Sequence, residues 1–303
     1  LRRYASVPRL RRNLHVEAGD QLWYLAMNLA IAPFDDVHVR RAVNFVIDKD
    51  SLVRAWGGPL QGHVARHVLP DNMIGGRLDD FHPYPSRDNA GDVARAKAEM
   101  RRSRYDSNRD GLCDRLACRG VVHIGRDVTP WSSLSLVIEA SLHKIGIEVE
   151  TNEPDDPYAA IQRLPNHAAL TSIPGWGKDY ADPYSFIGFL FDGRNIDARS
   201  NTNYSLVGLT EERAATLRID RQRGGVPSVD ADIDSCSELL PGEERLSCWI
   251  ALDRKLMTEI VPWVPYLDSN RILITSDDVR PYAFDQFSGE LSYAHVGVVR
   301  RER

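Results

Sequence analysis

The chain has 303 residues, of which 43% are hydrophobic and 27% are charged, and its formal net charge is −5. This composition is typical of a folded protein with one large or two medium domains, and it excludes a wholly disordered chain. The negative charge balance argues against a general nucleic-acid binder. The sequence has no run of about 18 uncharged apolar residues, so we predict no membrane-spanning helix.

Predicted strands and helices alternate along the chain. Residues 20–32 are nearly all apolar, as in a strand buried on both faces. Asp35 and Asp36 can then cap a helix, because the following apolar residues recur every three or four positions. Residues 57–87 are rich in Gly and Pro and predict a long irregular loop. Such alternation indicates an α/β or mixed α+β architecture.

The remaining elements are predicted in the same way. Helices are expected over residues 39–47, 48–56, 88–102, 130–146 and 159–164, from residue 210, and over residues 243–260. Strands are expected over residues 121–125, 147–151, 170–173, 262–267 and 271–275. The last stretch, residues 284–298, has a β-like pattern and is expected to pair with the first residues of the chain.

The four cysteines form two local pairs, Cys113 with Cys118 and Cys236 with Cys248. This arrangement predicts two disulfides and an oxidising compartment. A four-cysteine zinc site is an alternative, although the spacing is unusual for zinc. Four reduced, buried thiols are a second alternative.

Four segments carry recognisable motifs in a fixed order. The first contains PFDDVHVRRAV at residues 33–43 and IDKD at residues 47–50, and the second comprises residues 94–100 and 145–149. The third is GWGKDYADP at residues 175–183, and the fourth covers residues 259–266. Together they resemble family 5 extracellular solute-binding proteins, the oligopeptide- and dipeptide-binding subunits of ABC importers.

The resemblance implies a fold of two lobes that close on a ligand, of which this chain would be the C-terminal portion. Its fold class would be α/β (mixed α+β), a periplasmic-binding-protein-like lobe of type II (cluster C) with helices packed on a mixed sheet. Residues 1–25 would be hinge strands and a remnant of the first lobe. Residues 26–283 would form the second main ligand-binding lobe, and residues 284–303 would return to the first lobe.

The resemblance also indicates ligand-binding residues. Asp179 matches the acidic position that holds the α-ammonium group of a peptide, and Trp176 matches an aromatic position beside the side-chain pockets. Tyr204 lies in a segment that could reach the cleft. The alternatives are a turn or helix-cap role for Asp179 and an exposed loop position for Tyr204. Arg40 is expected to make a structural ion pair.

Residues 106–114 contain a possible calcium loop. Oxygen-bearing side chains occupy its positions 1, 3, 5 and 9, namely Asp106, Asn108, Asp110 and Asp114, and a glycine follows the third. Ala117 stands where a bidentate Glu would complete the calcium shell. The alternative is a polar turn that a Cys113–Cys118 disulfide holds shut.

We therefore predict an extracytoplasmic solute-binding protein, periplasmic or on the cell surface, secreted or lipid-anchored. It would capture peptides between lobes as a monomer and deliver them to the permease subunits of an ABC transporter, with no catalysis, no required cofactor and no nucleic acid. Within the family, an oligosaccharide or a nickel chelate is the alternative cargo. A carbohydrate hydrolase and a calcium-stabilised scaffold are alternatives from other classes.

His63, His67 and His82 share one loop and could bind a transition metal, although surface loop residues are the simpler interpretation.

Overall fold

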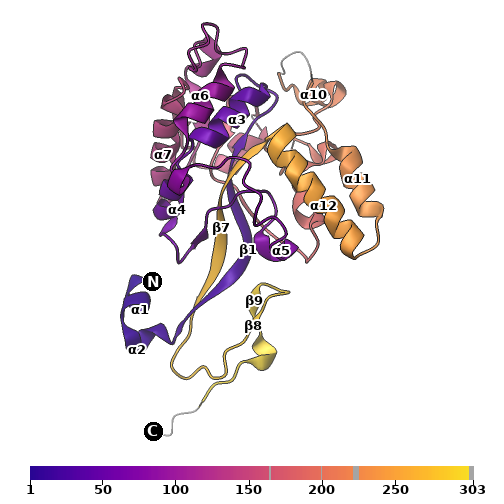
Figure 1. Cartoon of the computed structure of the whole chain (residues 1–303). Helices are drawn as coiled ribbons and strands as arrows, with labels where there is room; N and C mark the ends of the chain where they lie inside the picture. The colour runs from indigo at the N-terminus through magenta and orange to yellow at the C-terminus, as the bar shows by residue number, and fades with distance from the viewer. Residues whose placement is uncertain (164, 199, 221–224, 300–303) are drawn as a thin grey trace.

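The computed structural model describes residues 1–163, 165–198, 200–220 and 225–299 (Figure 1). Its main sheet has the order β2-β7-β1-β5-β3-β4, with β6 paired to β1 off this path. Strands β3, β4 and β5 run parallel, whereas β1 is antiparallel to β5, β6 and β7, so the sheet is mixed. The strands are β1 (Leu14–Met27), β2 (Gly62–His63), β3 (Val121–Ile124), β4 (Val149–Asn152), β5 (Leu170–Thr171), β6 (Gly175–Gly177) and β7 (Trp263–Ile274).

Helices cover the part of this sheet that contains the C-terminal end of β1 and the N-terminal end of β7. In Figure 1, α3, α4, α6 and α7 lie to one side of β1 and β7, and α11 and α12 lie to the other. Within the described part of the chain, no helix has the length and apolar character needed to cross a membrane. The helices are α1 (Arg2–Ser6), α2 (Pro8–Arg11), α3 (Val37–Val46), α4 (Lys49–Trp56), α5 (Asp71–Ile74), α6 (Val93–Met100), α7 (Trp131–His143), α8 (Pro157–Arg163), α9 (Tyr184–Phe191), α10 (Glu211–Leu217), α11 (Asp230–Glu238) and α12 (Glu243–Lys255).

Strands β1 and β7 form a long antiparallel ribbon that leaves the helical body. Their pairing runs from Leu14 opposite Ile274 to Ala26 opposite Trp263, with a register shift between Glu17 and Gln21. The predicted strands 262–267 and 271–275 are therefore one strand. The predicted strand 20–32 instead begins at Leu14 and ends at Met27. The N-terminal half of β1, which begins at Leu14, is less apolar than the half that ends at Met27. The reason is that the N-terminal half pairs with β7 outside the helical core.

Several helix starts agree with the sequence prediction. Asp36 accepts a hydrogen bond from His38 N at 2.8 Å, and Asp48 accepts one from Ser51 N at 2.9 Å. Thr210 caps α10 in the same way. The helix predicted over residues 88–102 begins only at Val93, because Gly91 has a φ of +83° and Asp92 provides the cap.

Arg40 has a different role from the one predicted. Its side chain is buried, and its guanidinium donates hydrogen bonds to the backbone carbonyls of Ile260 and Phe34, at 2.9 and 2.7 Å. Among the described residues it makes no direct ion pair. Arg40 therefore satisfies backbone acceptors at the end of one helix and in a turn, rather than neutralising a carboxylate.

The C-terminal stretch folds back on itself. Strands β8 (Phe284–Asp285) and β9 (Glu290–Leu291) pair with each other, so the expected pairing of residues 284–298 with the first residues is wrong. Gly289, with a φ of +70°, allows the tight turn that favours this local hairpin. Its contact with β1 is a side-chain hydrogen bond from Gln286 Nε2 to Ala18 O, 2.9 Å long. The division of the chain at residues 25 and 283 stays a prediction.

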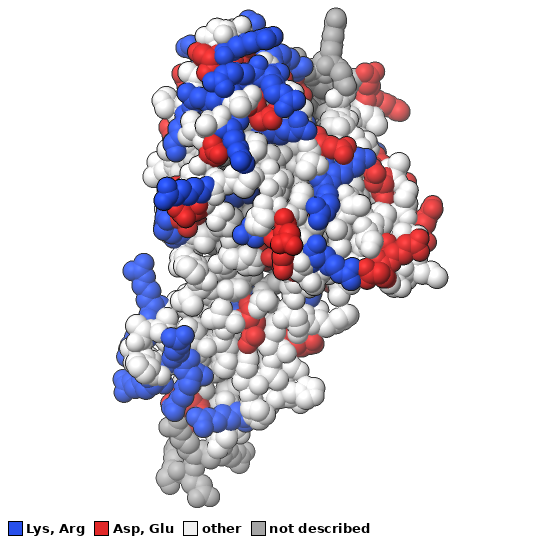
Figure 2. All heavy atoms as spheres, viewed as in Figure 1, with Lys and Arg blue, Asp and Glu red and all other residues white. Residues whose placement is uncertain are grey.

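Both predicted disulfides are present, Cys113–Cys118 and Cys236–Cys248. The second joins α11 to α12, at the end of the molecule where acidic side chains are prominent on the visible face (Figure 2). Basic side chains instead gather over α1 and α2 and over the upper helices. The core beneath α11, α12 and the upper helices is continuous and includes a stacked pair, Tyr24 and Trp263, with ring centroids 3.5 Å apart.

Candidate functional site

Three parallel strands end side by side in the main sheet. Ile124 of β3 lies opposite Asn152 of β4 and Thr171 of β5. In open α/β sheets, ligands bind beyond the carboxyl ends of such strands, where the following loops converge. We define the strand-end site by the side chains in the segments after β3 and β4 and by those of the segment that continues from β5 through β6, together with Tyr204, which packs beside Trp131. Its members are Arg126, Trp131, Tyr158, Trp176, Asp179 and Tyr204.

Arg126 follows β3 and contacts two aromatic rings. Its guanidinium carbon lies 5.1 Å from the centroid of the Trp131 ring and 5.9 Å from that of Tyr158, within the range of cation–π contacts. With the residues that the structure describes, Arg126 makes no ion pair and no side-chain hydrogen bond. The rings therefore orient a guanidinium whose charge and five donors remain available to an anion.

Tryptophan side chains extend this surface. The Trp131 ring lies 5.5 Å from Trp56 and 6.1 Å from Trp23, and Trp23 lies 4.3 Å from Trp56. The indole nitrogen of Trp56 donates to the Tyr266 hydroxyl at 3.2 Å. The Trp131 indole nitrogen is buried and finds no acceptor among the described residues. The three rings provide a large apolar contact area with little directional preference.

A buried imidazole lies under the strand ends. His123 of β3 bonds to Ser172 Oγ at 2.9 Å and to Thr151 Oγ1 at 3.2 Å. Burial lowers the pKa of His123 to about 4, so this group is neutral at pH 7. The imidazole beneath the strand ends is therefore a polar but uncharged group.

Trp176 is held in place by two elements. Trp176 of β6 lies opposite Leu22 of β1 in the sheet. Its indole nitrogen donates a hydrogen bond to Ser185 O in α9 at 2.7 Å. Because the indole nitrogen is already used, Trp176 can offer a ligand only its ring face and edge.

Asp179 differs from both of its charged neighbours. Lys178 Nζ lies 2.7 Å from Asp20, and Asp182 pairs with Arg245 at 2.9 Å. Asp182 also accepts a hydrogen bond from Tyr184 N at the start of α9. Asp179 is exposed and has no hydrogen bond or ion pair with any described residue. The structure therefore shows no helix-cap role for Asp179 and leaves its carboxylate available to a ligand.

Tyr204 is partly buried rather than exposed. It packs with Trp131 against Ile124 and Ile173 beneath the strand ends. Burial raises the pKa of Tyr204 to about 12, and the nearby Tyr158 adds to the shift. The phenol is therefore a neutral hydrogen-bonding group at the border of the site.

The predicted calcium loop is closed by its own hydrogen bonds. Asp106 accepts from Gly111 N at 2.7 Å, and Asp114 accepts from Ser107 N at 3.0 Å. Asn108 Nδ2 donates to Asp110 at 3.0 Å. These contacts fit a polar turn, and the same oxygens are those that calcium would need. Calcium at this loop stays a prediction, to be tested by titration.

Comparison with known proteins identifies the family. Residues 4–198 match the model described as bacterial extracellular solute-binding proteins, family 5 middle. The chain belongs to this family. The resemblance seen in the sequence is thereby confirmed, and so is the expectation of a solute-binding protein rather than an enzyme.

Relatives within the family bind different solutes. Heme-binding protein A of Haemophilus influenzae is 26% identical over 280 residues, which are 90% of this chain and 45% of that protein. The dipeptide-binding protein of Escherichia coli is 26% identical over 205 residues, 65% of this chain and 35% of that protein. The chain thus spans less than half the length of these family 5 relatives.

Among solved structures, clavulanic acid biosynthesis oligopeptide binding protein 2 superposes with a TM-score of 0.79 and 25% identity. The match covers 99% of this chain and 50% of that one. HbpA2 from Haemophilus parasuis superposes with a TM-score of 0.72 and 19% identity, over 97% of this chain and 52% of that one. The expected fold class, a periplasmic-binding-protein-like lobe with helices on a mixed sheet, is confirmed.

Sequence reasoning missed Arg126, Trp131 and Tyr158. A usable signal was present, because Arg126 directly follows a predicted strand and ligand-binding residues gather at such ends. The sequence could not show that the rings of Trp131 and Tyr158 lie against its guanidinium, because the three residues belong to different elements.

Proposed function

We propose that the protein is the solute-binding component of an ABC importer and that it captures short peptides at the strand-end site outside the cytoplasm. It acts as a monomer that presents its cargo to permease subunits. The observation that carries the proposal is a pair of opposite charges without ion-pair partners among the described residues: Arg126 in the segment after β3, and Asp179 in the segment after β6.

A free peptide is complementary to these charges. It carries an α-ammonium group at one end and an α-carboxylate at the other. Asp179 binds the ammonium group, and Arg126 binds the carboxylate with its fork of donors. A hydrogen bond to a charged group is worth about 1.5–3 kcal/mol, so the two ends together supply much of a micromolar affinity. Aromatic side chains accept varied peptide side chains through area rather than through fixed hydrogen bonds.

A second cargo is supported by a specific observation. Heme-binding protein A matches 90% of this chain, and the rings of Trp23, Trp56 and Trp131 offer apolar faces to a planar ligand. Haem carries carboxylates that Arg126 can bind, but it has no ammonium group for Asp179. The peptide proposal is preferred because it uses both charges.

The test is thermal unfolding of the purified protein with pools of di- to tetrapeptides that are free, N-acetylated or C-amidated. Haem, a mixture of oligosaccharides and a nickel chelate are measured in parallel. A ligand at 100 times its dissociation constant adds about 2.7 kcal/mol of stability, which is a readily measured shift. We expect a shift with free peptides that either end modification reduces. If the unfolding temperature rose with one of the other compounds and not with any peptide, the peptide proposal would be wrong and that compound would take its place as the cargo.

A further inference from the structure

A second cluster of polar side chains lies outside the strand-end site. Strand β2 pairs with β7 so that His63 lies opposite Asp268, and Asp71 begins α5 beside them. The backbone nitrogen of Asp71 donates to Asp268 Oδ2 at 3.0 Å. One ligand atom from each of the three side chains lies within 4.8 Å of the other two. Three separate elements thus bring one imidazole nitrogen and two carboxylate oxygens to a common point.

The spacing of these atoms is close to that of a metal site. His63 Nε2 lies 2.9 Å from Asp71 Oδ2 and 3.9 Å from Asp268 Oδ2. Ligand atoms bound to tetrahedral zinc at the usual bond lengths are about 3.4 Å apart. The two observed distances bracket this value, so movements of about half an ångström would bring the atoms into a coordination shell.

A second layer of contacts orients the possible ligands. The other oxygen of Asp71 lies 2.9 Å from His67 Nε2, and His67 Nδ1 lies 3.1 Å from Asp253. Asp253 is fully buried and also accepts hydrogen bonds from two backbone amides, those of Val68 and Leu69. Such outer partners fix ligand orientation in metal sites. The Asp71 carboxylate is therefore held in place before an ion arrives.

The charges of the cluster favour a cation. Three carboxylates, Asp71, Asp253 and Asp268, face two imidazoles. Arg66 on the same loop adds a positive charge near His63, although it forms no ion pair with any residue that the structure describes. With His63 neutral, as a metal ligand must be, the group has a net negative charge even with Arg66 included. The side chain of Asp268 is only 7% exposed, whereas that of His63 is 55% exposed. A cation can therefore enter from the His63 side and reach a carboxylate that water barely touches.

We infer that His63, Asp71 and Asp268 form a binding site for a divalent transition-metal ion, with zinc as the best match. One imidazole and two carboxylates suit zinc, cobalt or nickel better than calcium or magnesium, which prefer oxygen ligands alone. Three protein ligands leave a further position for water. The ion would link β2 and α5 to β7, near the point where the β1–β7 ribbon leaves the helical body (Figure 1).

The test is titration of the chelator-treated protein with ZnCl₂ by calorimetry, and with CoCl₂ followed by visible absorption. We expect one saturable site, and visible cobalt bands characteristic of low coordination number. Loss of an outer partner typically costs 10–100-fold in metal affinity, so loss of a ligand in His63→Gln should cost about 100-fold or more. His143→Gln is the matched control, because His143 is an exposed histidine at the end of α7.

Two further results decide the inference. Asp268→Asn should abolish the cobalt bands, and far-UV circular dichroism shows whether that variant is folded. His63 is mostly exposed, so His63→Gln keeps the test informative even if Asp268→Asn unfolds. No saturable binding up to millimolar zinc would overturn the inference. Equal affinity in the wild-type protein and His63→Gln would also overturn it, and would assign the ion to adventitious surface sites.

Discussion

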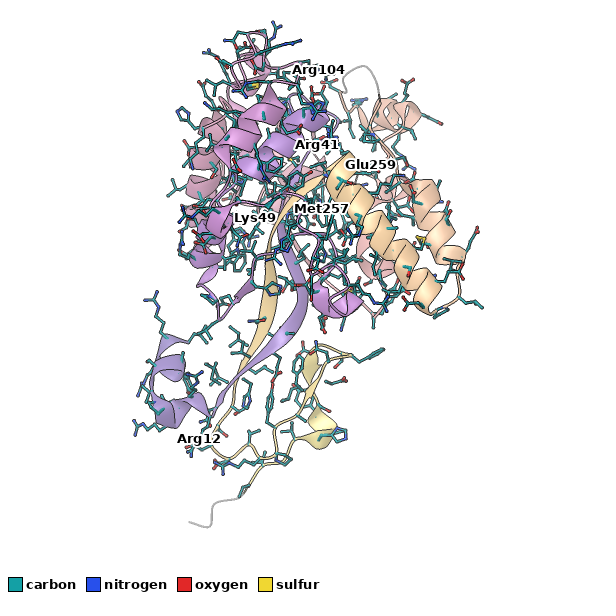
Figure 3. The ribbon with its side chains drawn as sticks, viewed as in Figure 1. Arg12, Arg41, Lys49, Arg104, Met257 and Glu259 are labelled. Atoms are coloured by element: carbon teal, nitrogen blue, oxygen red, sulfur yellow. A yellow bond between two sulfur atoms is a disulfide. The ribbon has the colours of Figure 1, made fainter. Side chains whose placement is uncertain are left out.

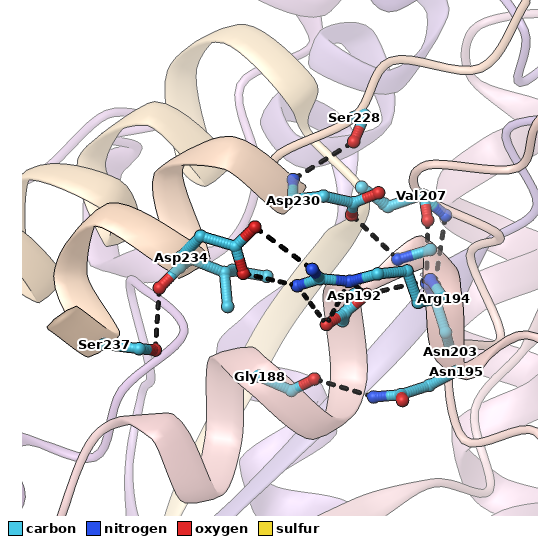
Figure 4. Close-up of polar contacts among 12 residues, drawn as sticks. Gly188, Asp192, Arg194, Asn195, Asn203, Val207, Ser228, Asp230, Asp234 and Ser237 are labelled. Atoms are coloured by element: carbon cyan, nitrogen blue, oxygen red, sulfur yellow. Dashed lines mark hydrogen bonds and ion pairs between the residues drawn. The ribbon is translucent and has the colours of Figure 1, made fainter.

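Two regions of this molecule use arginine in opposite ways. At the junction of α9 and α11, Arg194 bonds to Asp192 at 2.8 Å and to both oxygens of Asp234, at 3.0 and 2.6 Å (Figure 4). Asp230 accepts from the backbone nitrogen of Gly193 at 2.8 Å in the same network. At the strand-end site, Arg126 lies against the rings of Trp131 and Tyr158 and has no ion-pair partner among the described residues.

The comparison distinguishes charged side chains that stabilise the folded protein from charged side chains that are available to bind a ligand. The hydrogen bonds of Arg194 to Asp192 and Asp234 raise the pKa of its guanidinium further, and the network ties the turn after α9 to α11. An oriented but unpaired charge such as Arg126 brings no comparable stabilisation to the folded state. Under the proposed function, the ligand supplies the missing partner. Substitutions in the first region should therefore lower stability without changing binding, by an amount that the exposure of Arg194 keeps small, and those in the second region should change binding.

The largest expected effect on stability is removal of the Cys236–Cys248 disulfide, which joins α11 to α12. The bridge spans 12 residues, and closure of a loop of this size stabilises by about 3 kcal/mol in the chain-entropy model. The double variant Cys236→Ser/Cys248→Ser should lower the free energy of unfolding in urea by about this amount. Its peptide affinity should be unchanged, and a parallel loss of affinity would contradict the separation of the two regions.

Substitutions at the strand-end site should have the reverse effect. Arg126→Gln and Asp179→Asn each remove a charge-assisted contact and should weaken peptide binding about 10–100-fold. Neither side chain has an ion-pair or hydrogen-bond partner among the described residues, and the cation–π contacts of Arg126 are worth only about 0.5–1 kcal/mol at an exposed site, so the free energy of unfolding should stay within about 1 kcal/mol of the wild type. Calorimetry with free and end-modified peptides measures the change in peptide affinity, and urea denaturation measures the free energy of unfolding. The proposal also requires that Arg126→Gln bind free and C-amidated peptides with similar affinity.

Lys49, labelled in Figure 3, extends the comparison, because it is buried and has no carboxylate partner among the residues that the structure describes. Its ammonium group donates a hydrogen bond to Ala65 O at 3.2 Å. Burial, together with the nearby Arg66, lowers the pKa of Lys49 to about 7 from its ordinary 10.5. Burial without a counter-ion therefore favours the neutral form of the Lys49 amine.

The pH dependence follows from this pKa. Between pH 7 and 10.5 the unfolded chain holds a proton on Lys49 that the folded protein lacks, so Lys49 makes stability rise with pH across this window. Below pH 7 its unfavourable contribution is complete. Lys49→Met should raise the free energy of unfolding most at pH 6 and should flatten the rise. Urea denaturation of both proteins at pH 6, 8 and 10 measures the difference, and an unchanged slope would contradict the prediction.

The smallest expected effect belongs to Arg194→Gln. The Arg194 side chain is 53% exposed, and exposed ion pairs contribute little even when their geometry is good. We expect a slight fall in the urea midpoint that shrinks at high salt, and no change in peptide affinity. Because it removes an arginine as Arg126→Gln does, this variant is the matched control. A loss of peptide affinity equal to that of Arg126→Gln would remove the distinction between the two arginines.

The local signals of this protein were readable from the sequence. The caps of α3, α4 and α10 lie within three residues of the amides that they bind, and each disulfide joins cysteines that are close in the chain. The family motifs also occupy short segments. Such features depend on neighbours along the chain, so composition and spacing are sufficient to predict them.

Only the tertiary structure decided which distant residues meet. It joined the N-terminal half of β1 to β7 and closed residues 284–291 into their own hairpin. It placed Arg126 against Trp131 and Tyr158, and His63 opposite Asp268. Strand pairing and side-chain packing depend on elements far apart in sequence, and one strand pattern is compatible with many partners. The sequence by itself therefore determined the family and most of the elements, and the fold determined which charges are paired and which remain free for a ligand.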